Sequence, residues 1–424
     1  MSEPQQIDIQ GHLVTVKHPA TQEELGQMVH AAAQAGQAIY PVGGGTRQYL
    51  GLPPVNPGIG LCTRKLDRVI DYPARDMTVT VELGMTVAKL REVLAGENQD
   101  LPIDCPDPSR ATLGGLLATN GSGSRRHGYG TLRDYLLGLT VIDDHGRPTK
   151  SGGRVVKNVA GYDMGKLHIG ALGTLGPLVQ ATFKLKPRPE ATALSLVPLA
   201  PDQLEAFANQ MNQGQTRPIV IDLLSAGAAR EFARLAGQTL PREGWHGLVG
   251  FDGAEMAVRW QLETLRDELR SIANGDLLEL VSHAEAWEAL TALGGARGTT
   301  GLRAGVLPGE TVGLARSLET WAPASGVVAH LGAGIINAWG DPDTSREPLL
   351  GQVERLRHQA QPKRLQDQAQ PKGGWLVVTR SGPTARDARM VFGSARQDHP
   401  LMAEIKRQLD PGCLFNPGRY LTDL

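Results

Sequence analysis

The most distinctive chemical feature of the sequence is the segment Pro41-Val-Gly-Gly-Gly-Thr-Arg47. Three consecutive glycines have no Cβ, so the backbone can reach positive φ and approach another molecule closely. Successive amide N–H groups in such a turn form a concavity that binds anions. We therefore interpret this loop as a phosphate cradle, with a tight turn that binds nothing as the alternative for the motif taken alone.

Two further glycine clusters follow within the first 176 residues. One contains Gly114-Gly115 with Gly121 and Gly123, and the other contains Gly173 and Gly176. Thr, Asn or Ser accompanies each cluster, and these short side chains can hydrogen-bond to phosphate, ribose or the edge of a flavin. A turn explains any single cluster, but three with the same chemistry favour a cradle for a large anionic cofactor.

Other cofactor and catalytic motifs do not occur in the sequence. Gly170-Ala-Leu-Gly-Thr-Leu-Gly176 lacks the spacing of a dinucleotide fingerprint and precedes a predicted strand. There is no Walker A loop, no Gly-x-Ser-x-Gly elbow and no His-Glu-x-x-His pair. These absences leave no basis for an ATPase, a serine hydrolase or a zinc peptidase, and no metal site is predicted.

Composition limits the class of protein further. A chain of 424 residues is long enough for two or three domains, and its net charge of −1 with scattered basic residues indicates no nucleic-acid partner. Cys62, Cys105 and Cys413 are far apart and form no disulfide or zinc pattern. Without a signal-peptide core or a membrane-length apolar run, we expect a cytoplasmic protein. Any membrane contact would be peripheral, at the inner face of the cytoplasmic membrane.

The elements that position the glycine clusters can be predicted from periodicity. Thr21 begins a capping-box pattern before a helix that ends at Gly36, and a strand at 38–40 leads into the first glycine loop. A similar pattern recurs, with a strand at 77–83 and a helix capped by Thr86. The class expected is α+β. The predicted domains are a glycine-rich, cofactor-binding domain of two α/β subdomains at 1–189, an α+β cap at 190–370, and a C-terminal segment at 371–424.

The glycine motifs, their order and the terminal Phe415-Asn-Pro-Gly-Arg419 resemble the vanillyl-alcohol-oxidase-type flavoproteins, which have a PCMH-type FAD-binding domain. The segment Gly153-Arg-Val-Val-Lys-Asn-Val-Ala-Gly-Tyr-Asp163 is more specific, and is similar to the FAD-binding subunit of bacterial glycolate oxidases. The resemblance covers residues from about 10 to 189 and the last 30 to 40 or so, and the cap matches only in general character.

The resemblance implies FAD as the cofactor and assigns residues to it. The first loop would hold the pyrophosphate, the second cluster would line the flavin and its phosphates, Gly173 and Thr174 would contact the adenosine or ribityl part, and Asn416 would return to the flavin. The implied FAD-binding residues are Val42, Gly43, Gly44, Gly45, Thr46, Asp107, Pro108, Thr112, Leu113, Gly114, Gly115, Thr119, Asn120, Gly121, Gly173, Thr174 and Asn416.

Two departures from the family pattern matter. Many relatives attach FAD through a histidine just after the first glycine pair, where this chain has Thr46 and Arg47, so we expect non-covalent FAD. Catalytic relatives also carry a His-x-Gly-Asp-Gly-Asn-x-His pattern that binds a metal, where this chain reads His330-Leu-Gly-Ala-Gly-Ile-Ile-Asn337. This remnant keeps one histidine and no acid. A single histidine is commonly structural, so His330, Arg47 and Arg419 are the remaining catalytic candidates.

The leading hypothesis is therefore the FAD-binding subunit of a glycolate (2-hydroxyacid) oxidase complex, which oxidises glycolate to glyoxylate. By resemblance, its partners would be a homologous catalytic FAD-binding subunit and an iron–sulfur subunit that receives the electrons. Two alternatives are an assembly or electron-relay subunit without its own active site, and a stand-alone D-2-hydroxyacid (D-lactate) dehydrogenase. The split FAD domain and the terminal motif argue against the FAD subunit of a molybdenum hydroxylase.

Overall fold

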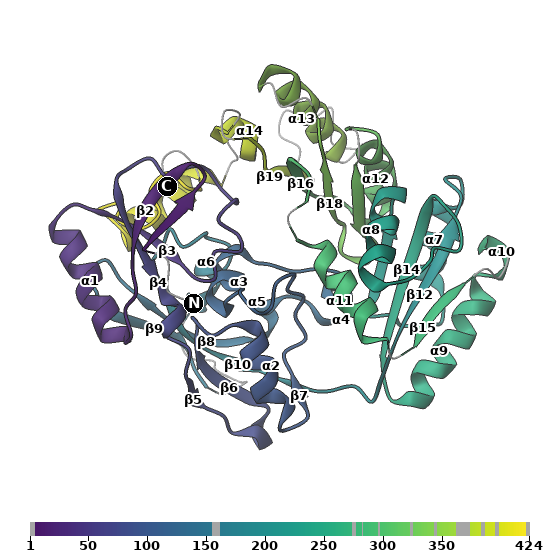
Figure 1. Cartoon of the computed structure of the whole chain (residues 1–424), viewed down its shortest axis with the longest axis horizontal. Helices are drawn as coiled ribbons and strands as arrows, with labels where there is room; N and C mark the ends of the chain where they lie inside the picture. The colour runs from purple at the N-terminus through teal and green to yellow at the C-terminus, as the bar shows by residue number, and fades with distance from the viewer. Residues whose placement is uncertain are drawn as a thin grey trace.

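The computed structural model describes residues 5–154, 162–273, 277–281, 283–295, 297–322, 325–342, 346–361, 374–382, 386–394 and 398–420. Three main sheets organise them into two lobes (Figure 1). The N-terminal lobe contains a four-stranded and a five-stranded sheet, and the second lobe is built on an eight-stranded sheet. Residues 155–161, which carry most of the resemblance to the glycolate oxidase subunit, lie outside the described residues.

The four-stranded sheet has the order β1-β2-β4-β3 and carries the first glycine loop. β2, β4 and β3 run parallel, and β1 pairs with β2 in the antiparallel sense. β3 is fully buried except at Pro41, and its last residue, Val42, leads directly into the glycines. The bounds are β1 Gln6–Ile9, β2 His12–Lys17, β3 Ala38–Val42 and β4 Gly58–Cys62.

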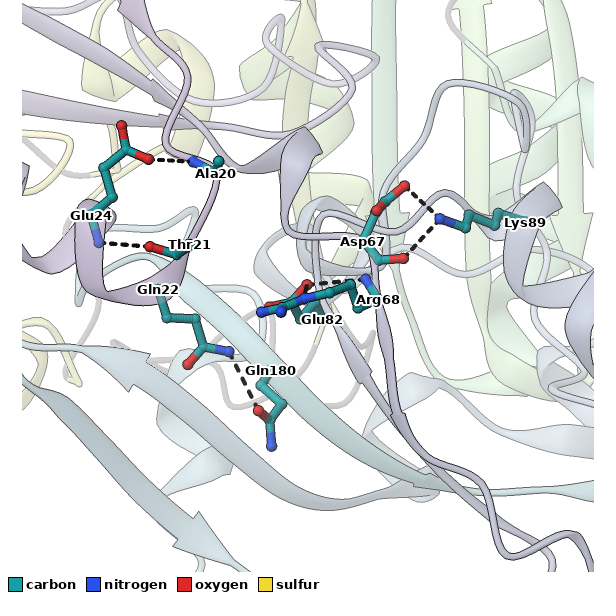
Figure 2. Close-up of polar contacts among 9 residues, drawn as sticks. All are labelled: Ala20, Thr21, Gln22, Glu24, Asp67, Arg68, Glu82, Lys89 and Gln180. Atoms are coloured by element: carbon teal, nitrogen blue, oxygen red, sulfur yellow. Dashed lines mark hydrogen bonds and ion pairs between the residues drawn. The ribbon is translucent and has the colours of Figure 1, made fainter.

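Helix α1 (Gln22–Gln34) begins where the capping pattern predicts. The Glu24 N–H donates to Thr21 Oγ1 at 3.0 Å, and Glu24 Oε2 accepts from the Ala20 N–H at 2.7 Å (Figure 2). Leu25, Val29 and Ala32 then fall on one helical face and are buried against the sheet. Gln22 contacts Gln180 of the five-stranded sheet, so α1 also links the two sheets of this lobe.

The five-stranded sheet has the order β5-β6-β10-β8-β9 and is antiparallel throughout. Glu82 on β6 is fully buried, and Arg68 satisfies it through its backbone N–H and its guanidinium (Figure 2). A short pair, β7 with β11, adjoins the sheet. The bounds are β5 Val69–Asp71, β6 Thr78–Glu82, β7 Gln99–Asp100, β8 Leu136–Ile142, β9 Pro148–Gly152, β10 Leu178–Lys184 and β11 Lys186–Pro187.

The helices of the N-terminal lobe are mostly short. α2 begins at Thr86, whose hydroxyl accepts from the Lys89 N–H, as the sequence predicts. The recurrence of strand and capped helix is real, but the second unit contributes to the five-stranded sheet and not to the sheet of the first. The bounds are α2 Val87–Ala95, α3 Leu113–Thr119, α4 Arg126–Tyr129, α5 Leu132–Tyr135 and α6 Gly165–His168, with 3₁₀ turns at Thr63–Lys65 and Ala74–Asp76.

The second lobe is an antiparallel sheet of order β15-β12-β14-β13-β17-β18-β16-β19. Its last strand, β19, comes from beyond residue 370, so the cap includes part of the segment that we expected to complete the cofactor site. The bounds are β12 Ala191–Leu199, β13 Val220–Leu224, β14 Trp245–Gly253, β15 Leu278–Val281, β16 Thr300–Gly305, β17 Gly326–His330, β18 Ile335–Gly340 and β19 Trp375–Arg380.

Helices cover the eight-stranded sheet unequally on its two faces. One face joins α7, α9, α12 and α13 in a single apolar core, and part of the other face packs on α8 and α11. The helices are α7 Leu204–Gln213, α8 Ala226–Ala236, α9 Glu255–Glu268, α10 Arg270–Ala273, α11 Ala284–Leu293, α12 Thr311–Glu319, α13 Arg346–Ala360, α14 Ala388–Phe392 and α15 His399–Leu409, with 3₁₀ turns at Pro308–Glu310 and Leu331–Ala333.

The rest of the sheet face that packs on α8 and α11 is not covered by these helices, and strand alternation determines which side chains it carries. Leu302, Ala304, Ile336 and Ala338 point into the core of the covered face. Their neighbours in the chain, Arg303, Asn337 and Trp339, therefore point the other way, and all three line a cavity. This half of the sheet face is polar and aromatic because it forms a cavity wall and not a helix interface.

The chain finally returns to the first lobe, where its C-terminal part lies beside β2 and β3 (Figure 1). The Ile39 N–H donates to the Leu414 carbonyl, and the Asn416 N–H donates to the Ile39 carbonyl, both at 2.8 Å. The return is made by α15 and residues 410–419, whereas β19 and α14 adjoin the second lobe. The domain limits at 189 and 370 stay a prediction, and β19 pairs with β16 of the second lobe.

Candidate functional site

A narrow pocket lies where the three glycine clusters meet, and we call it the glycine pocket. Its volume is about 90 Å³. Eleven predicted FAD-binding residues line it, together with Arg47 and Arg419. These eleven are Val42, Gly43, Gly44, Gly45, Thr46, Thr112, Gly114, Gly115, Thr119, Gly173 and Asn416.

The first loop has the properties of an anion-binding turn. In the part of the chain that the structure describes, the N–H groups of Gly44, Gly45 and Thr46 donate to no protein acceptor. Gly45 has φ +70°, a conformation that strongly favours glycine. A Cβ on Gly44 would lie 1.7 Å from the Arg110 carbonyl oxygen, so the loop has room only for glycine at that position. Free amides in a loop of this shape fit a pyrophosphate.

The second cluster is organised by helix α3. Thr112 Oγ1 accepts from the Gly115 N–H at 3.2 Å and so begins the helix, and Asn120 ends it in the left-handed conformation. Asn120 Oδ1 is buried and has no donor among the described residues. A buried acceptor without a donor indicates that a further group completes the site. Asn120 lies next to the pocket lining, so this orphan acceptor fits a cofactor that donates a hydrogen bond.

The third wall is held by the C-terminal segment. Asn416 donates through Nδ2 to the Leu172 carbonyl at 2.5 Å, which fixes the loop before Gly173. Lys406 is buried, and its Nζ donates to the Thr174 carbonyl at 2.6 Å, to Asp410 Oδ2 at 2.5 Å and to the Phe415 carbonyl at 2.9 Å. Residues more than two hundred positions apart are therefore clamped together at this wall.

Six predicted residues lie outside the pocket lining, and most of them have structural roles. Leu113 is in the core, and Thr174 donates its hydroxyl to the Ala171 carbonyl. The carbonyls of Asp107 and Pro108 accept from Ala111 and Ala88. Gly121 lies against the Arg47 guanidinium. Asn120, with its orphan oxygen, is the sixth. The assignment of all seventeen residues to FAD stays a prediction.

A second, larger cavity of about 550 Å³ lies between the two lobes, and we call it the sheet cavity. Arg47, Leu50, Thr119 and Leu172 line both the sheet cavity and the glycine pocket, so the two spaces adjoin. The wall from the second lobe is the uncovered face of β16, β18 and β19, with Arg303, Asn337, Trp339, Trp375 and Val377. A cofactor seated in the glycine pocket would reach the sheet cavity past the four shared residues.

Arginines dominate the charge at this cavity. Arg303 Nη2 and Arg126 Nη1 both donate to Ser122 Oγ, at 3.2 Å and 3.3 Å. Burial, with a smaller contribution from the charges of Arg47 and Arg126, lowers the pKa of Arg303 to about 10. We call Arg47, Arg126 and Arg303 the arginine cluster. None of them forms an ion pair with a carboxylate of the described residues, and Arg303 Nε is buried without a partner there. Such a cluster attracts an anionic ligand.

His330 is enclosed and does not line either cavity. Its Nδ1 lies 2.7 Å from Asp222 Oδ1, and its Nε2 lies 3.0 Å from Asn337 Nδ2. With the Asp222 carboxylate accepting from Nδ1–H, Nε2 accepts from the Asn337 amide. Asn337 thus stands between the imidazole and the cavity. Across the described ranges, no cluster of three or more His, Cys, Asp or Glu residues could hold a metal ion.

The other two catalytic candidates have different surroundings. Arg419 donates to the carbonyls of Leu52, Gln48 and Leu50, so it fixes the segment after the first loop. Arg47 lines both cavities. Sequence reasoning missed Ser122, Arg126 and Arg303. It also missed His399, which lines the sheet cavity and whose buried Nε2 has no partner among the described residues. One signal was available: Arg303 is the one charged residue of the strand Thr300–Gly305.

Comparisons with known proteins identify the cofactor. Residues 15–152 match the family described as FAD binding domain. The first lobe contains an FAD-binding domain. The whole chain also resembles a solved 4-ethylphenol oxidase from Gulosibacter chungangensis, with TM-score 0.68, 15% identity and coverage of 96% of this chain and 89% of that one. The PCMH-type α+β fold and FAD as cofactor are therefore confirmed.

Two sequence relatives extend the comparison beyond the FAD-binding domain. A D-2-hydroxyglutarate dehydrogenase from Xanthomonas citri pv. viticola is 26% identical over 95% of this chain and 88% of its own length. The glycolate oxidase subunit GlcE of Escherichia coli is 34% identical, over 35% of this chain and 43% of its own length. The prediction of an FAD-dependent oxidoreductase is confirmed. Among the described residues, no helix is long and apolar enough to cross a membrane.

Proposed function

We propose that the chain oxidises a 2-hydroxyacid with FAD, as the FAD-binding subunit of a glycolate-oxidase-type complex. The observation that carries this proposal is the arginine cluster, because two of its members, Arg47 and Arg303, line the cavity that adjoins the glycine pocket. A 2-hydroxyacid has a carboxylate next to the carbon that is oxidised. Holding the carboxylate on a fixed guanidinium therefore also positions the reacting carbon.

Arg303 is the side chain best placed to bind the carboxylate. Its position is fixed by the sheet and by Ser122, and its buried Nε has no partner among the described residues. Bound FAD supplies the acceptor for the hydride that leaves the α-carbon. A base for the hydroxyl proton is also required, and His399 is the histidine of the sheet cavity. His330 positions Asn337 from behind the cavity wall.

Membership of a complex is supported by two resemblances. The 153–163 segment is similar to the FAD-binding subunit of glycolate oxidases, and the similarity to GlcE covers part of this chain. The proposed partners are a homologous catalytic FAD-binding subunit and an iron–sulfur subunit. A relative that matches 95% of this chain is named a D-2-hydroxyglutarate dehydrogenase, so a stand-alone D-2-hydroxyacid dehydrogenase is the second form of the same proposal.

A different candidate is an assembly or electron-relay subunit without its own active site. One observation favours it: the described residues contain no metal-binding cluster, and Asn337 separates His330 from the cavity. The two candidates differ in whether substrate reduces the FAD of this chain.

Anaerobic mixing separates them. The FAD-loaded chain is mixed with glycolate, D-lactate or D-2-hydroxyglutarate, and flavin absorbance is followed in a stopped-flow instrument. Catalysis by this chain predicts bleaching within seconds, and an Arg303→Met variant should lose about 30-fold or more in kred/Kd, because about 2 kcal/mol or more is lost when one partner of a buried charge pair is removed. Arg316→Met, an exposed change on α12, is the matched control. Flavin that stays oxidised with all substrates supports the relay function.

A further inference from the structure

The sheet cavity is wide, and aromatic residues line it from both lobes. Its volume is about 550 Å³, and Tyr49, Trp339, Trp375, Phe392 and Tyr420 all line it. Phe392 and Tyr420 form an edge-to-face pair with ring centroids 5.3 Å apart. A ligand with two carbon atoms, such as glycolate, would leave these rings without a contact. The sheet cavity therefore fits a larger ligand.

Glycines allow the two indoles to lie over the neighbouring strands. A Cβ on Gly326 of β17 would lie 2.1 Å from the Trp339 ring, and a Cβ on Gly305 of β16 would lie 2.5 Å from the Trp375 ring. Since Cβ points out of the sheet, each indole must cover the glycine beside it. The sheet thus presents indole surface where side chains of ordinary size would stand.

The register places these indoles around the arginine that binds the carboxylate. Arg303 lies opposite Asn337 on β18 and Val377 on β19. Gly301 lies two residues before Arg303 on β16 and pairs with Trp339 of β18. Gly305 lies two residues after Arg303 and pairs with Trp375 of β19. Two residues span about 7 Å along a strand, so Arg303 lies between the two indoles along the strand, with the Trp375 ring over β16 and the Trp339 ring over β17.

The two sides of the sheet cavity come from different lobes. The residues that the glycine pocket and the sheet cavity share belong to the first lobe: Arg47, Leu50, Thr119 and Leu172. FAD held in the glycine pocket would enter along them. The indole wall belongs to β18 and β19 of the second lobe, so it remains available to the substrate.

We propose that the sheet cavity is specific for 2-hydroxy acids whose side chain is aromatic or large and apolar, of the 3-phenyllactate type, with Trp339 and Trp375 as specificity-determining residues. This inference rests on the proposed function, because it takes the 2-hydroxyacid carboxylate to bind Arg303. An apolar side chain buried against an indole adds binding energy, whereas glycolate has no side chain to bury. The indole rings offer apolar surface to such a side chain and no charge to a second carboxylate.

Binding tests the inference independently of turnover. The FAD-loaded chain is titrated with 3-phenylpropionate and with propionate by calorimetry, and neither acid can be oxidised as a 2-hydroxyacid. We expect 3-phenylpropionate to bind about tenfold or more tightly, since each apolar group added in a fitted pocket contributes about tenfold or more. Trp339→Leu and Trp375→Leu should each reduce that preference, and Trp260→Leu, on the exposed face of α9, should not. Equal affinity for the two acids, or a preference unchanged in both variants, overturns the inference.

Flavin reduction then separates this inference from the proposed function. The FAD-loaded chain is mixed anaerobically with D-3-phenyllactate, glycolate and D-2-hydroxyglutarate. Faster reduction by phenyllactate supports the inference. Faster reduction by glycolate or by D-2-hydroxyglutarate overturns it but keeps the proposed function. It is also possible that no hydroxyacid reduces the flavin although 3-phenylpropionate binds with the expected preference. That result refutes the proposed oxidation of a 2-hydroxyacid by this chain and supports the specificity of the cavity for aromatic acids.

Discussion

The buried pair of Lys406 and Asp410 yields the sharpest prediction for the stability of the cofactor site. Both side chains are almost fully buried, and their charged atoms lie 2.5 Å apart. Lys406 also donates to the carbonyls of Thr174 and Phe415, and Asp410 accepts from the N–H groups of Leu414 and Phe415. Every charged atom of the pair is thus satisfied within the first lobe.

Lys406→Met removes the ammonium and leaves the Asp410 carboxylate buried with two amide donors. Breaking a buried pair on one side costs about 3–5 kcal/mol, because the remaining charge loses its partner. The two amides offset part of this loss, so we expect about 3 kcal/mol in the free energy of unfolding. The same change frees the Thr174 carbonyl beside Gly173, so FAD should be released at lower denaturant concentrations than in the wild type.

Urea unfolding, followed by circular dichroism and by flavin fluorescence, measures both effects. Arg407→Met breaks the exposed pair with Glu404 on the same helix and should change stability by no more than about 1 kcal/mol. The double variant Lys406→Met with Asp410→Asn should recover part of the loss, because no charge is left buried. A loss below about 1 kcal/mol for Lys406→Met, with unchanged FAD release, would refute the view that this pair clamps the third wall.

Three further predictions concern the cofactor and pH. Gly44→Ala should weaken FAD binding at least tenfold in a fluorescence titration, because its Cβ would lie 1.7 Å from the Arg110 carbonyl, whereas Gly412→Ala meets no atom within 4 Å and should not. Acid precipitation should leave all FAD in the supernatant, and flavin that stays with the protein would contradict non-covalent binding. Burial lowers the pKa of His168 to about 4. The unfolded chain therefore binds a proton first as the pH falls below about 6.5, and stability is lost between there and pH 4. His168→Gln should reduce the loss of unfolding free energy between pH 7.5 and 5 by about 2 kcal/mol, and an unchanged loss would count against this.

Local signals in the sequence predicted much of the cofactor side. Thr21 and Thr86 both cap helices where their spacing indicates, because capping depends on residues within one turn. The glycine loop and Asn416 come together at one pocket, as the family motifs imply. These features depend on residues close in the sequence or on family motifs, so they can be predicted without knowledge of the tertiary structure.

The substrate side could not be predicted in the same way. Arg303 and Asn337 are neighbours only because β16 and β18 pair in one register, and Arg126 approaches them from the other lobe. Strand order in the eight-stranded sheet does not follow chain order, so alternation alone does not tell which strands meet. For the same reason, no local pattern indicated that residues 375–380 extend the cap.

The pairing of Ile39 with Leu414 and Asn416 has a consequence for how the protein matures. The first glycine loop leaves the ribosome early, but the wall that Asn416 and Lys406 hold is synthesised last. During translation the first lobe therefore has only two of its three walls, and the cap must be made before the third arrives. Loading with FAD then follows release of residues 399–419 from the ribosome, and a nascent chain stalled before them should fail to retain the flavin.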